Sequence, residues 1–214
     1  MIKKLSPLPN LLIKRYKNWK STTYLENKNK FKKLASLGQN PKYMIISCCD
    51  SRVHVTSIFG AQEGEFFIHR NIANLVPPYS PDGDNYGTSA AIEYATKALK
   101  ISNIIILGHT NCGGIDGAYK LHKNDLNETY VFINKWLNLI LPAFKNISRE
   151  IPKKNQIKQL EQESIKNSLN NLLSFPNVKK GVEEKEILIH GLIHDIESGQ
   201  LQYLNPDTEE FENI

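Results

Sequence analysis

At 214 residues the chain is long enough for one domain of ordinary size, and its 40% hydrophobic and 23% charged residues are typical of a folded protein. This composition excludes collagen-like and intrinsically disordered chains. The net charge of +5 is spread along the chain without a basic surface interleaved with aromatics, so we expect it to serve solubility rather than nucleic-acid binding. The three cysteines are too few for a disulfide scaffold.

The apolar runs are short. The longest, such as residues 104–107, fall far below the ~20 residues of a membrane-spanning helix. The basic first residues are not followed by the apolar stretch of ~7–15 residues that a signal peptide contains. We therefore expect a cytoplasmic protein that binds neither membranes nor nucleic acid.

The first predicted element is helical. Residues 9–38 carry apolar side chains at helical spacing among many lysines, and Gly38 follows as a helix stop. We expect an N-terminal helical arm over residues 1–38 and a single α/β domain over residues 39–214.

Three short apolar runs rich in β-branched or aromatic residues predict buried strands at 43–48, 66–69 and 103–107. Between the second and the third, residues 87–99 form an alanine-rich stretch that predicts a helix. A strand, a helix and a strand in this order predict a parallel sheet.

The C-terminal half has helical periodicity over 129–148 and 155–173, and residues 186–190 are a fourth candidate strand. Residues 192–197 and 201–204, joined by a Ser-Gly turn, predict an antiparallel hairpin at a sheet edge. The expected fold is thus α/β, with a central, mainly parallel sheet flanked by helices.

Two of the predicted strands end in residues that can carry chemistry. Cys48, Asp50 and Arg52 follow the first strand with the spacing C-x-D-x-R, and His109 and Cys112 follow the third as H-x-x-C. In an open parallel sheet, sites form beyond the carboxyl ends of neighbouring strands. Two thiolates and one imidazole are a recognised ligand set for catalytic zinc, which keeps a fourth position open for water.

Less specific interpretations stay open for these residues. His109 and Cys112 alone are typical of a core histidine and a buried cysteine, although the flanking Gly108, Gly113 and Gly114 favour a tight turn with close backbone approach. Asp50 and Arg52 alone are typical of an ion pair at a strand end.

Two further residues lie close to these motifs. Cys49 is expected to point away from the site and to serve packing, because successive side chains of an extended strand point to opposite sides. His54 has a weaker claim to a proton-relay role, which rests only on its nearness to Arg52.

The sequence resembles a known family. Residues 48–53 (CCDSRV), 70–78 (RNIANLVPP), 87–94 (GTSAAIEY), 108–114 (GHTNCGG) and 190–199 (HGLIHDIESG) are similar to the β-class carbonic anhydrases, in the same order. The resemblance covers the chain from about residue 39 to residue 204, and several ordered motifs over this length are highly specific.

The resemblance implies one Zn²⁺ per chain, held by Cys48, His109 and Cys112, with Asp50 paired to Arg52 beside the metal. It also implies a substrate-side amide and an apolar CO2 pocket, made of Gln39, Phe67, Ile72 and Tyr94. The expected activity is that of a zinc lyase, carbonate dehydratase, which hydrates CO2 reversibly to bicarbonate and a proton. The expected assembly is a homodimer whose subunits share each cleft, often built into a homotetramer, with the helical arm clasping the partner.

Some members of that family close the site by binding the aspartate as a fourth zinc ligand, and they hold bicarbonate at a separate inhibitory site. Asp50 could serve as that ligand here. However, Ile45 and His194 stand where those members carry Trp and Tyr, and only Arg70 matches. We therefore expect an open site without the bicarbonate pocket.

Three rival functions remain. A CS2 or COS hydrolase on the same scaffold would act on similarly linear, apolar substrates. A non-catalytic structural zinc module would explain the ligands, but it would not need Asp50, Arg52 or Gln39. A cysteine nucleophile with His109 as its base would need no metal.

Overall fold

The computed structural model describes residues 5–83, 86–126 and 130–214. The chain forms two compact units, Met1–Gln39 and Asn40–Ile214. Within the described residues, no helix combines the length and the apolar character that a bilayer crossing requires.

The N-terminal unit is helical, as predicted, and its described residues form the helices α1 (Asn10–Ser21), α2 (Thr23–Glu26) and α3 (Lys28–Leu37). Gly38 ends α3 with a left-handed φ of 71°. None of the three helices buries a residue, although the rings of Trp19, Tyr24 and Phe31 contact one another. The arm therefore has an aromatic cluster but no core of its own.

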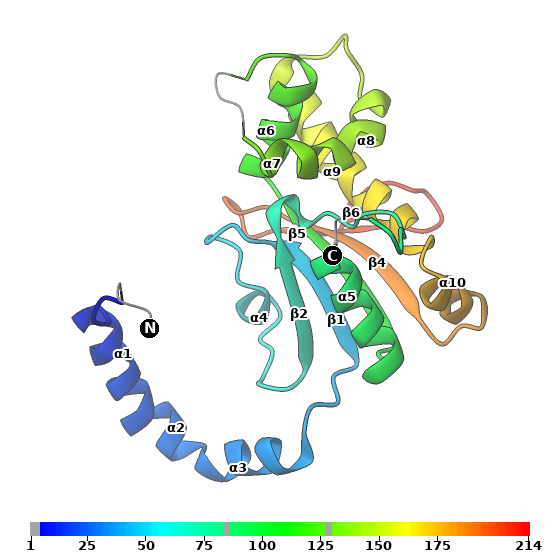
Figure 1. Ribbon diagram of the computed structural model, residues 1–214. Coiled ribbons are helices and arrows are strands. Elements are labelled where there is room, and N and C mark those ends of the chain that lie inside the picture. Colours follow the sequence, from blue (N-terminus) through cyan, green and yellow to red (C-terminus); the bar gives the residue numbers. More distant parts are fainter. Residues whose placement is uncertain (1–4, 84–85, 127–129) are drawn as a thin grey trace. The chain divides into compact units, whose positions relative to one another are not determined.

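The second unit contains a six-stranded sheet in the order β2-β1-β3-β4-β5-β6 (Figure 1). Its strands are β1 (Tyr43–Cys48), β2 (Phe66–Asn71), β3 (Asn103–His109), β4 (Leu188–His194), β5 (Leu201–Leu204) and β6 (Phe211–Asn213). The first four pair in parallel, and β5 and β6 add antiparallel. The predicted α/β class with a mainly parallel sheet is confirmed.

The helices of this unit are α4 (Val55–Ile58), α5 (Tyr86–Glu93), α6 (Gly113–His122), α7 (Ile133–Leu137), α8 (Leu141–Asn146), α9 (Lys153–Leu172) and α10 (Pro176–Glu183). Short turns of other helix types are η1 (Ile72–Asn74), η2 (Tyr94–Ala98) and η3 (Asn138–Ile140). Figure 1 shows α6, α7 and α8 gathered at the end of the sheet toward which the arrows of β1 and β2 point, with α9 running from this group toward α10.

Alternation along the strands sends side chains into separate cores. Met44 and Ile46 of β1 pack with Ile165 of α9 on one face of the sheet, whereas Ile45 packs with Val55 of α4 on the other. A third cluster, built from side chains of α6, α7, α8 and α9, contains both Cys48 and Cys112. The cysteines thus lie at a junction between the sheet and the helical group.

Two C-terminal expectations are wrong in detail. The strand predicted at 186–190 and the first arm of the predicted hairpin form one strand, β4, which runs through Gly191. A Cβ on Gly191 would come within 2.9 Å of Ile165 Cγ2, so this glycine allows α9 to approach the strand and does not end it. The hairpin pairs β4 with β5, but β6, which was not predicted, forms the sheet edge.

The helix predicted over 129–148 is interrupted. The chain forms α7, η3 and α8 there, with Pro142 in the first turn of α8, and residue 129 lies outside the described residues. Proline cannot donate the backbone hydrogen bond that a continuous helix needs. The predicted helix 87–99 also divides, into α5 and the π-helical turn η2.

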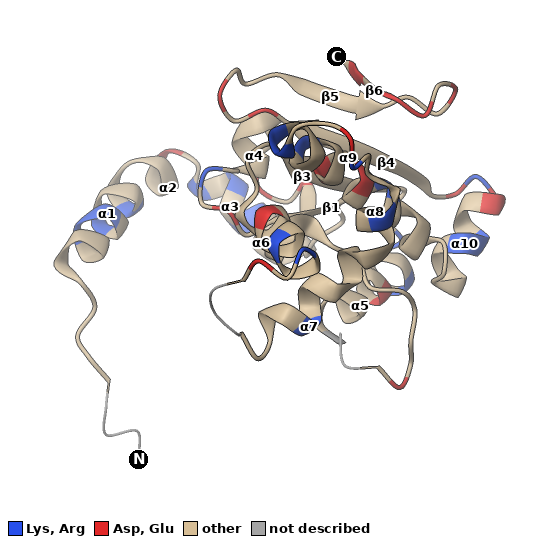
Figure 2. Ribbon diagram, turned by 90° about the horizontal axis from the view of Figure 1, so that it is seen from above, with Lys and Arg blue, Asp and Glu red and all other residues tan. Residues whose placement is uncertain are grey.

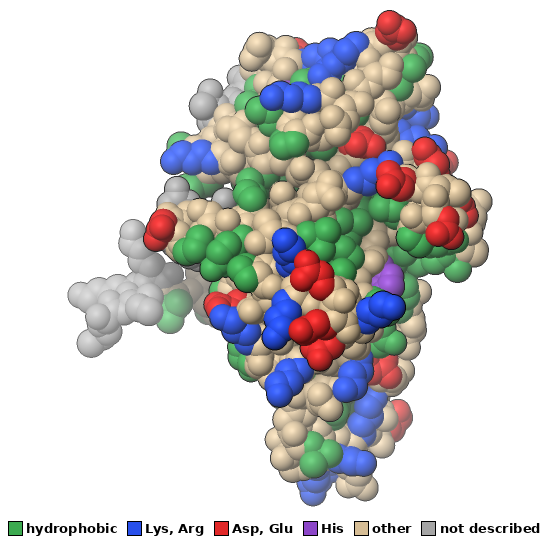
Figure 3. Space-filling view, turned by 90° about the vertical axis from the view of Figure 1, so that its right-hand side faces the viewer, with side chains coloured by type: hydrophobic (Ala, Val, Ile, Leu, Met, Phe, Trp, Pro, Cys, Tyr) green, Lys and Arg blue, Asp and Glu red, His purple; other side chains and the backbone are tan. Residues whose placement is uncertain are grey.

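The surface charge is mixed. Figure 2 shows Lys and Arg interspersed with Asp and Glu along the chain, and Figure 3 shows the same mixture over one face. Exposed ion pairs such as Lys120 with Asp116 neutralise part of the basic charge. The role of the net charge stays a prediction, since the mixed distribution shows only that charges of both signs share the surface.

Candidate metal centre

The carboxyl ends of β1 and β3 bring the first two candidate ligands together. The strands are parallel neighbours, with Ser47 opposite Leu107, so Cys48 and His109 both leave the same end of the sheet. Cys112 follows as the N-cap of α6, after a turn in which Asn111 adopts a left-handed φ of 56°. The turn therefore places its left-handed residue at an asparagine and not at one of the flanking glycines.

The three candidate ligand atoms lie within 4.8 Å of one another, and all three residues are buried. The two Sγ atoms are 3.9 Å apart. His109 Nδ1 donates to the carbonyl of Thr110 at 2.9 Å, whereas its Nε2 is buried and has no hydrogen-bond partner among the described residues. A buried nitrogen with a free lone pair beside two thiols is the donor set of a tetrahedral zinc site with one open position.

The protonation of the two thiols is coupled. The pKa of Cys48 is lowered, chiefly by the neighbouring Cys112 thiol and then by the imidazole of His109 and the amides of Asp50 and Ala73. The pKa of Cys112 is raised by the same contact and by burial. The neighbouring thiol thus favours the thiolate form at Cys48, and a cation bound between the two sulfur atoms would favour it at both cysteines.

The backbone around Cys48 adopts a rare conformation. Ala73 and Asn74 have left-handed φ values of 63° and 50°, which cost free energy for residues other than glycine. A Cβ on Gly114 would come within 2.9 Å of Ala73 Cβ, so the start of α6 can approach η1 only with glycine there. Gly113, by contrast, has open space around it, which corrects the expectation of close approach at that position.

Asp50 and Arg52 form a two-bond ion pair beside the cluster. Arg52 Nε and Nη2 donate to Asp50 Oδ1 and Oδ2 at 2.9 and 2.7 Å, and Nη2 also donates to the Asn111 carbonyl at 3.0 Å. The hydrogen bonds from Arg52 hold the pKa of Asp50 well below its usual range. Asp50 Oδ2 lies 3.9 Å from His109 Nε2, so an ionised carboxylate faces the candidate metal position.

Arg70 holds the loop that carries these groups. Its guanidinium donates to the backbone carbonyls of Cys48, Asp50 and Val53 at 2.8, 2.7 and 2.9 Å. Sequence reasoning considered Arg70 only as an anchor for bicarbonate and missed these contacts. In this structure its donors serve the loop between the first ligand and Asp50.

The residues of the expected CO2 pocket are divided. Ile72 packs in the cluster that contains Cys48 and Cys112. Phe67 of β2 lies opposite Met44 of β1, whereas Cys48 lies opposite Asn71. Phe67 is thus four residues, or ~13 Å along the strand, from the level of Cys48. Its ring instead contacts that of Tyr94, with the centroids 5.9 Å apart. Gln39 is the last residue of the N-terminal unit, and its role stays a prediction.

Two neighbouring residues have other environments. Cys49 is exposed, so the expectation that it serves packing is wrong. His54 caps α4: its Nδ1 accepts from the backbone N–H of Ser57 and lies 2.8 Å from the Ser57 hydroxyl. This side-chain arrangement supports a structural role for His54.

Sequence reasoning missed Glu161, a buried residue of α9 whose Oε1 accepts from the backbone N–H of Cys112 at 3.1 Å. Burial raises the pKa of this carboxyl to about 7. A single glutamate in an otherwise polar helix carries no sequence signal of burial, so only the fold reveals the contact.

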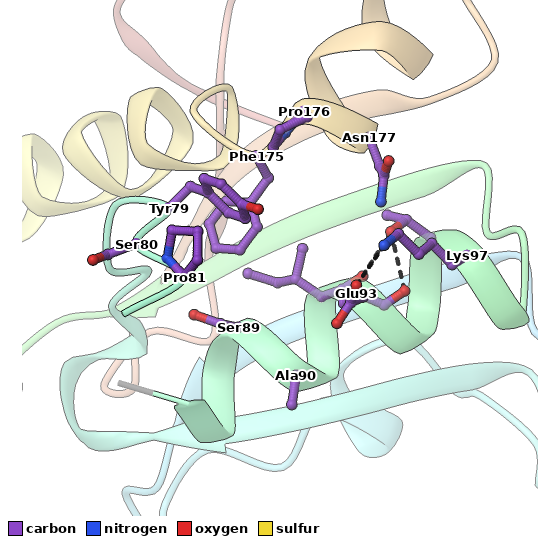
Figure 4. A pocket seen from close by; sticks show the side chains of 12 residues that line it. Tyr79, Ser80, Pro81, Ser89, Ala90, Glu93, Lys97, Phe175, Pro176 and Asn177 are labelled. Atoms are coloured by element: carbon purple, nitrogen blue, oxygen red, sulfur yellow. Dashed lines mark hydrogen bonds and ion pairs between the residues drawn. The ribbon is translucent and has the colours of Figure 1, made fainter. Parts of the chain in front are cut away.

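A cavity of about 470 Å³ lies elsewhere, between the loop at Tyr79, the helical segment of α5 and η2, and the start of α10 (Figure 4). The ring of Tyr79 packs edge-on against Phe175 at one side, and the Glu93–Lys97 ion pair lies at the other. None of the three candidate metal ligands lines this cavity.

Comparison with known proteins agrees with the geometry. Residues 43–201 match the family described as carbonic anhydrase. Beta carbonic anhydrase 3 of Arabidopsis thaliana is 35% identical over 185 residues, which cover 85% of this chain and 71% of that protein. Beta carbonic anhydrase 6, mitochondrial, of the same plant is 35% identical over 191 residues, which cover 88% of this chain but only 64% of the relative.

Solved structures of the same class share the fold. The β-carbonic anhydrase CcaA superposes with a TM-score of 0.84 at 29% identity, covering 95% of this chain and 90% of that one. A structure from a study of two tetrameric β-carbonic anhydrases of Sordaria macrospora superposes with a TM-score of 0.79 at 30% identity, covering 91% and 95%. With the Cys-His-Cys cluster at the sheet end, these similarities show that the chain belongs to the β-class of the carbonic anhydrase family.

Proposed function

We propose that Cys48, His109 and Cys112 hold one Zn²⁺ per chain and that the protein catalyses the reversible hydration of CO2. The observation that carries this proposal is the buried, partnerless Nε2 of His109 beside two thiols. Zinc bound there would supply a Lewis acid that activates water for attack on a carbonyl-type carbon.

The residues around the cluster have separate tasks in this proposal. The Asp50 carboxylate accepts a hydrogen bond from the attacking water and orients it toward CO2. Arg52 holds this carboxylate ionised and fixes its direction, because its Nε donates to one carboxylate oxygen and its Nη2 donates to the other. Since Arg52 also binds the Asn111 carbonyl, it ties the two ligand-bearing loops together.

We propose that the fourth zinc position stays open in the active protein, because Asp50 remains paired with Arg52 and does not bind the metal. The engagement of Arg70 with three backbone carbonyls supports this, since that guanidinium would otherwise be the anchor for an inhibitory bicarbonate. Crystal structures of the zinc-loaded protein across the neutral and alkaline range test it, and Asp50 bound to zinc above neutral pH would contradict it.

The apolar pocket is proposed to be completed by a second subunit. Ile72 packs beside the ligands of its own chain, whereas Phe67 lies four residues along β2 from the partner of Cys48 and its ring contacts Tyr94 of η2. We propose that Phe67 and Tyr94, together with Gln39, line the partner's cleft in a homodimer. The tetrameric β-carbonic anhydrases of Sordaria macrospora support an oligomer. We propose that the protein acts in the cytoplasm.

The arm is proposed to bind that second copy. Its exposed leucines, Leu11 at 58% and Leu12 at 47%, have no core in their own unit to cover them. We expect Leu11→Asp with Leu12→Asp to shift the protein toward monomers in light scattering after size exclusion. Lys17→Glu makes the same charge change on the same helix and should leave the assembly intact, and an unchanged oligomer in the leucine variant would contradict the proposal.

The pH profile should reflect the two sulfur ligands. Two thiolates would cancel the charge of Zn²⁺, so the site would lower the pKa of its water less than a site with three neutral histidines does. CO2 hydration should therefore rise between about pH 6.5 and about pH 9. Asp50 does not contribute to this rise, because its lowered pKa keeps it ionised throughout the range. Stopped-flow rates in non-coordinating buffers measure the profile, and a plateau from pH 6.5 upward would contradict the expectation.

Substrate choice decides between the two activities that this scaffold could support. We expect rapid CO2 hydration by the purified protein in a stopped-flow indicator assay and no sulfide release from CS2 or COS. Sulfide release without CO2 hydration would assign the protein to the rival hydrolase. Absence of both activities in a zinc-loaded protein would favour the structural zinc module.

A further inference from the structure

The most unusual charged group outside the proposed active site is the carboxyl group of Glu161. Glu161 is 4% exposed, and within the described residues no lysine or arginine forms an ion pair with it. Burying an ionisable group without a cation costs free energy unless hydrogen bonds offset the cost. The backbone amide of Cys112 donates such a bond at 3.1 Å, and the amide of Asn111 also stabilises the carboxylate.

Close packing of α9 on β3 sets the position of this side chain. A Cβ on Gly108 would come within 2.7 Å of Ile165 Cδ1, so glycine at the end of β3 allows α9 to lie directly against the strand. Glu161 precedes Ile165 by one helical turn and therefore lies on the same face of α9. The strand that supplies His109 and the helix that supplies Glu161 are thus held in fixed register.

The backbone N–H that donates to Glu161 belongs to a strained turn at the start of α6. Cys112 is the N-cap of α6, and its N–H is among the first four of a helix, which lack intrahelical partners. The preceding residue, Asn111, has a left-handed φ of 56°. Without an acceptor, the buried Cys112 amide would be unsatisfied, and the turn between the two ligands would lose its anchor.

We propose that Glu161 is a positioning residue for zinc, which fixes Cys112 through its backbone amide and so strengthens metal binding. This inference rests on the zinc site proposed above. Removal of a group that orients a metal ligand typically weakens metal affinity by ~10–100-fold. Here the orientation acts on the ligand's main chain and not on its side chain.

Competition of purified protein with a chromophoric zinc chelator tests the proposal. Glu161→Met removes the acceptor at similar volume and should weaken zinc affinity by ~10–100-fold relative to wild type. Glu161→Gln keeps an acceptor oxygen and should stay within about tenfold of wild type, since a neutral hydrogen bond is weaker than a charged one. The control is Gln156→Met. Gln156 lies on α9, as Glu161 does, and its buried side chain accepts a hydrogen bond from the Tyr119 hydroxyl of α6. Its substitution removes this acceptor and should lower the Tm without changing zinc affinity.

Wild-type affinity in Glu161→Met would overturn the proposal, and so would an equal loss in Glu161→Gln or in Gln156→Met. If Glu161→Met does not fold, Glu161→Asp decides, because its carboxylate is one methylene too short to reach the amide. That variant should bind zinc ~10–100-fold more weakly and alter the thiolate-to-metal bands of its cobalt(II) form, and unchanged affinity would overturn the proposal. Failure of the wild-type protein to bind zinc would instead refute the proposed function itself.

Discussion

Cys48→Ser is expected to abolish zinc binding and, with it, CO2 hydration. Serine is nearly isosteric, but its hydroxyl does not ionise near neutral pH and is a far poorer zinc ligand than a thiolate. The loss of activity should exceed the ~10–100-fold that removal of an outer-shell partner typically costs. Elemental analysis and stopped-flow hydration on the same preparation measure both effects.

The adjacent cysteine provides a matched control. Cys49 is exposed and lies outside the ligand cluster, so Cys49→Ser should retain zinc and wild-type rates. Full hydration in zinc-free Cys48→Ser, or equal losses in the two variants, would contradict the assignment of Cys48. Activity that survives zinc removal but not Cys48→Ser would point to thiol catalysis instead.

Asp50→Asn is expected to keep zinc and to lose most of the hydration rate. A neutral amide oxygen accepts a hydrogen bond from the attacking water more weakly than a carboxylate does, and the NH2 group would face Arg52, whose donors now bind the two carboxylate oxygens. Loss of a positioned group that binds the attacking water typically costs ~10²–10⁴-fold in rate. The stopped-flow rate per bound zinc is the quantity to compare.

Asp116→Asn separates this effect from a general loss of negative charge. Asp116 lies in the first turn of α6, four residues after Cys112, but it pairs with Lys120 at the surface. Its substitution should leave the rate per zinc unchanged. A rate in Asp50→Asn close to that of wild type would remove Asp50 from the mechanism.

Periodicity and strand endings predicted much of the fold. The runs that became β1, β2 and β3 are apolar and end in polar residues, so their type and parallel order could be inferred from the sequence. The interruption within 129–148 was missed because α7, η3 and α8 retain helical spacing of apolar residues, although Pro142 is a sequence signal for such a break. The strand β6 is short and polar and gains its stability from pairing with β5, which local sequence does not reveal.

The site was predictable where chemistry is tied to residue type and spacing. Cys48, His109 and Cys112 are unusual residues placed directly after buried strands, and the structure brings them within 4.8 Å of one another. Arg70 and Glu161 act on backbone groups of the ligand-bearing loops, and contacts with the main chain leave no pattern in the sequence. Phe67 and Tyr94 need a second subunit to acquire their proposed role, which one chain cannot reveal.

Metal removal and restoration test the central claim most directly. CO2 hydration is measured by stopped flow on one preparation before zinc is stripped by a chelator, after stripping, and after return of one equivalent of Zn²⁺ per chain. We expect activity to be lost with the metal and to recover fully at one equivalent. Undiminished hydration in the stripped protein would contradict it.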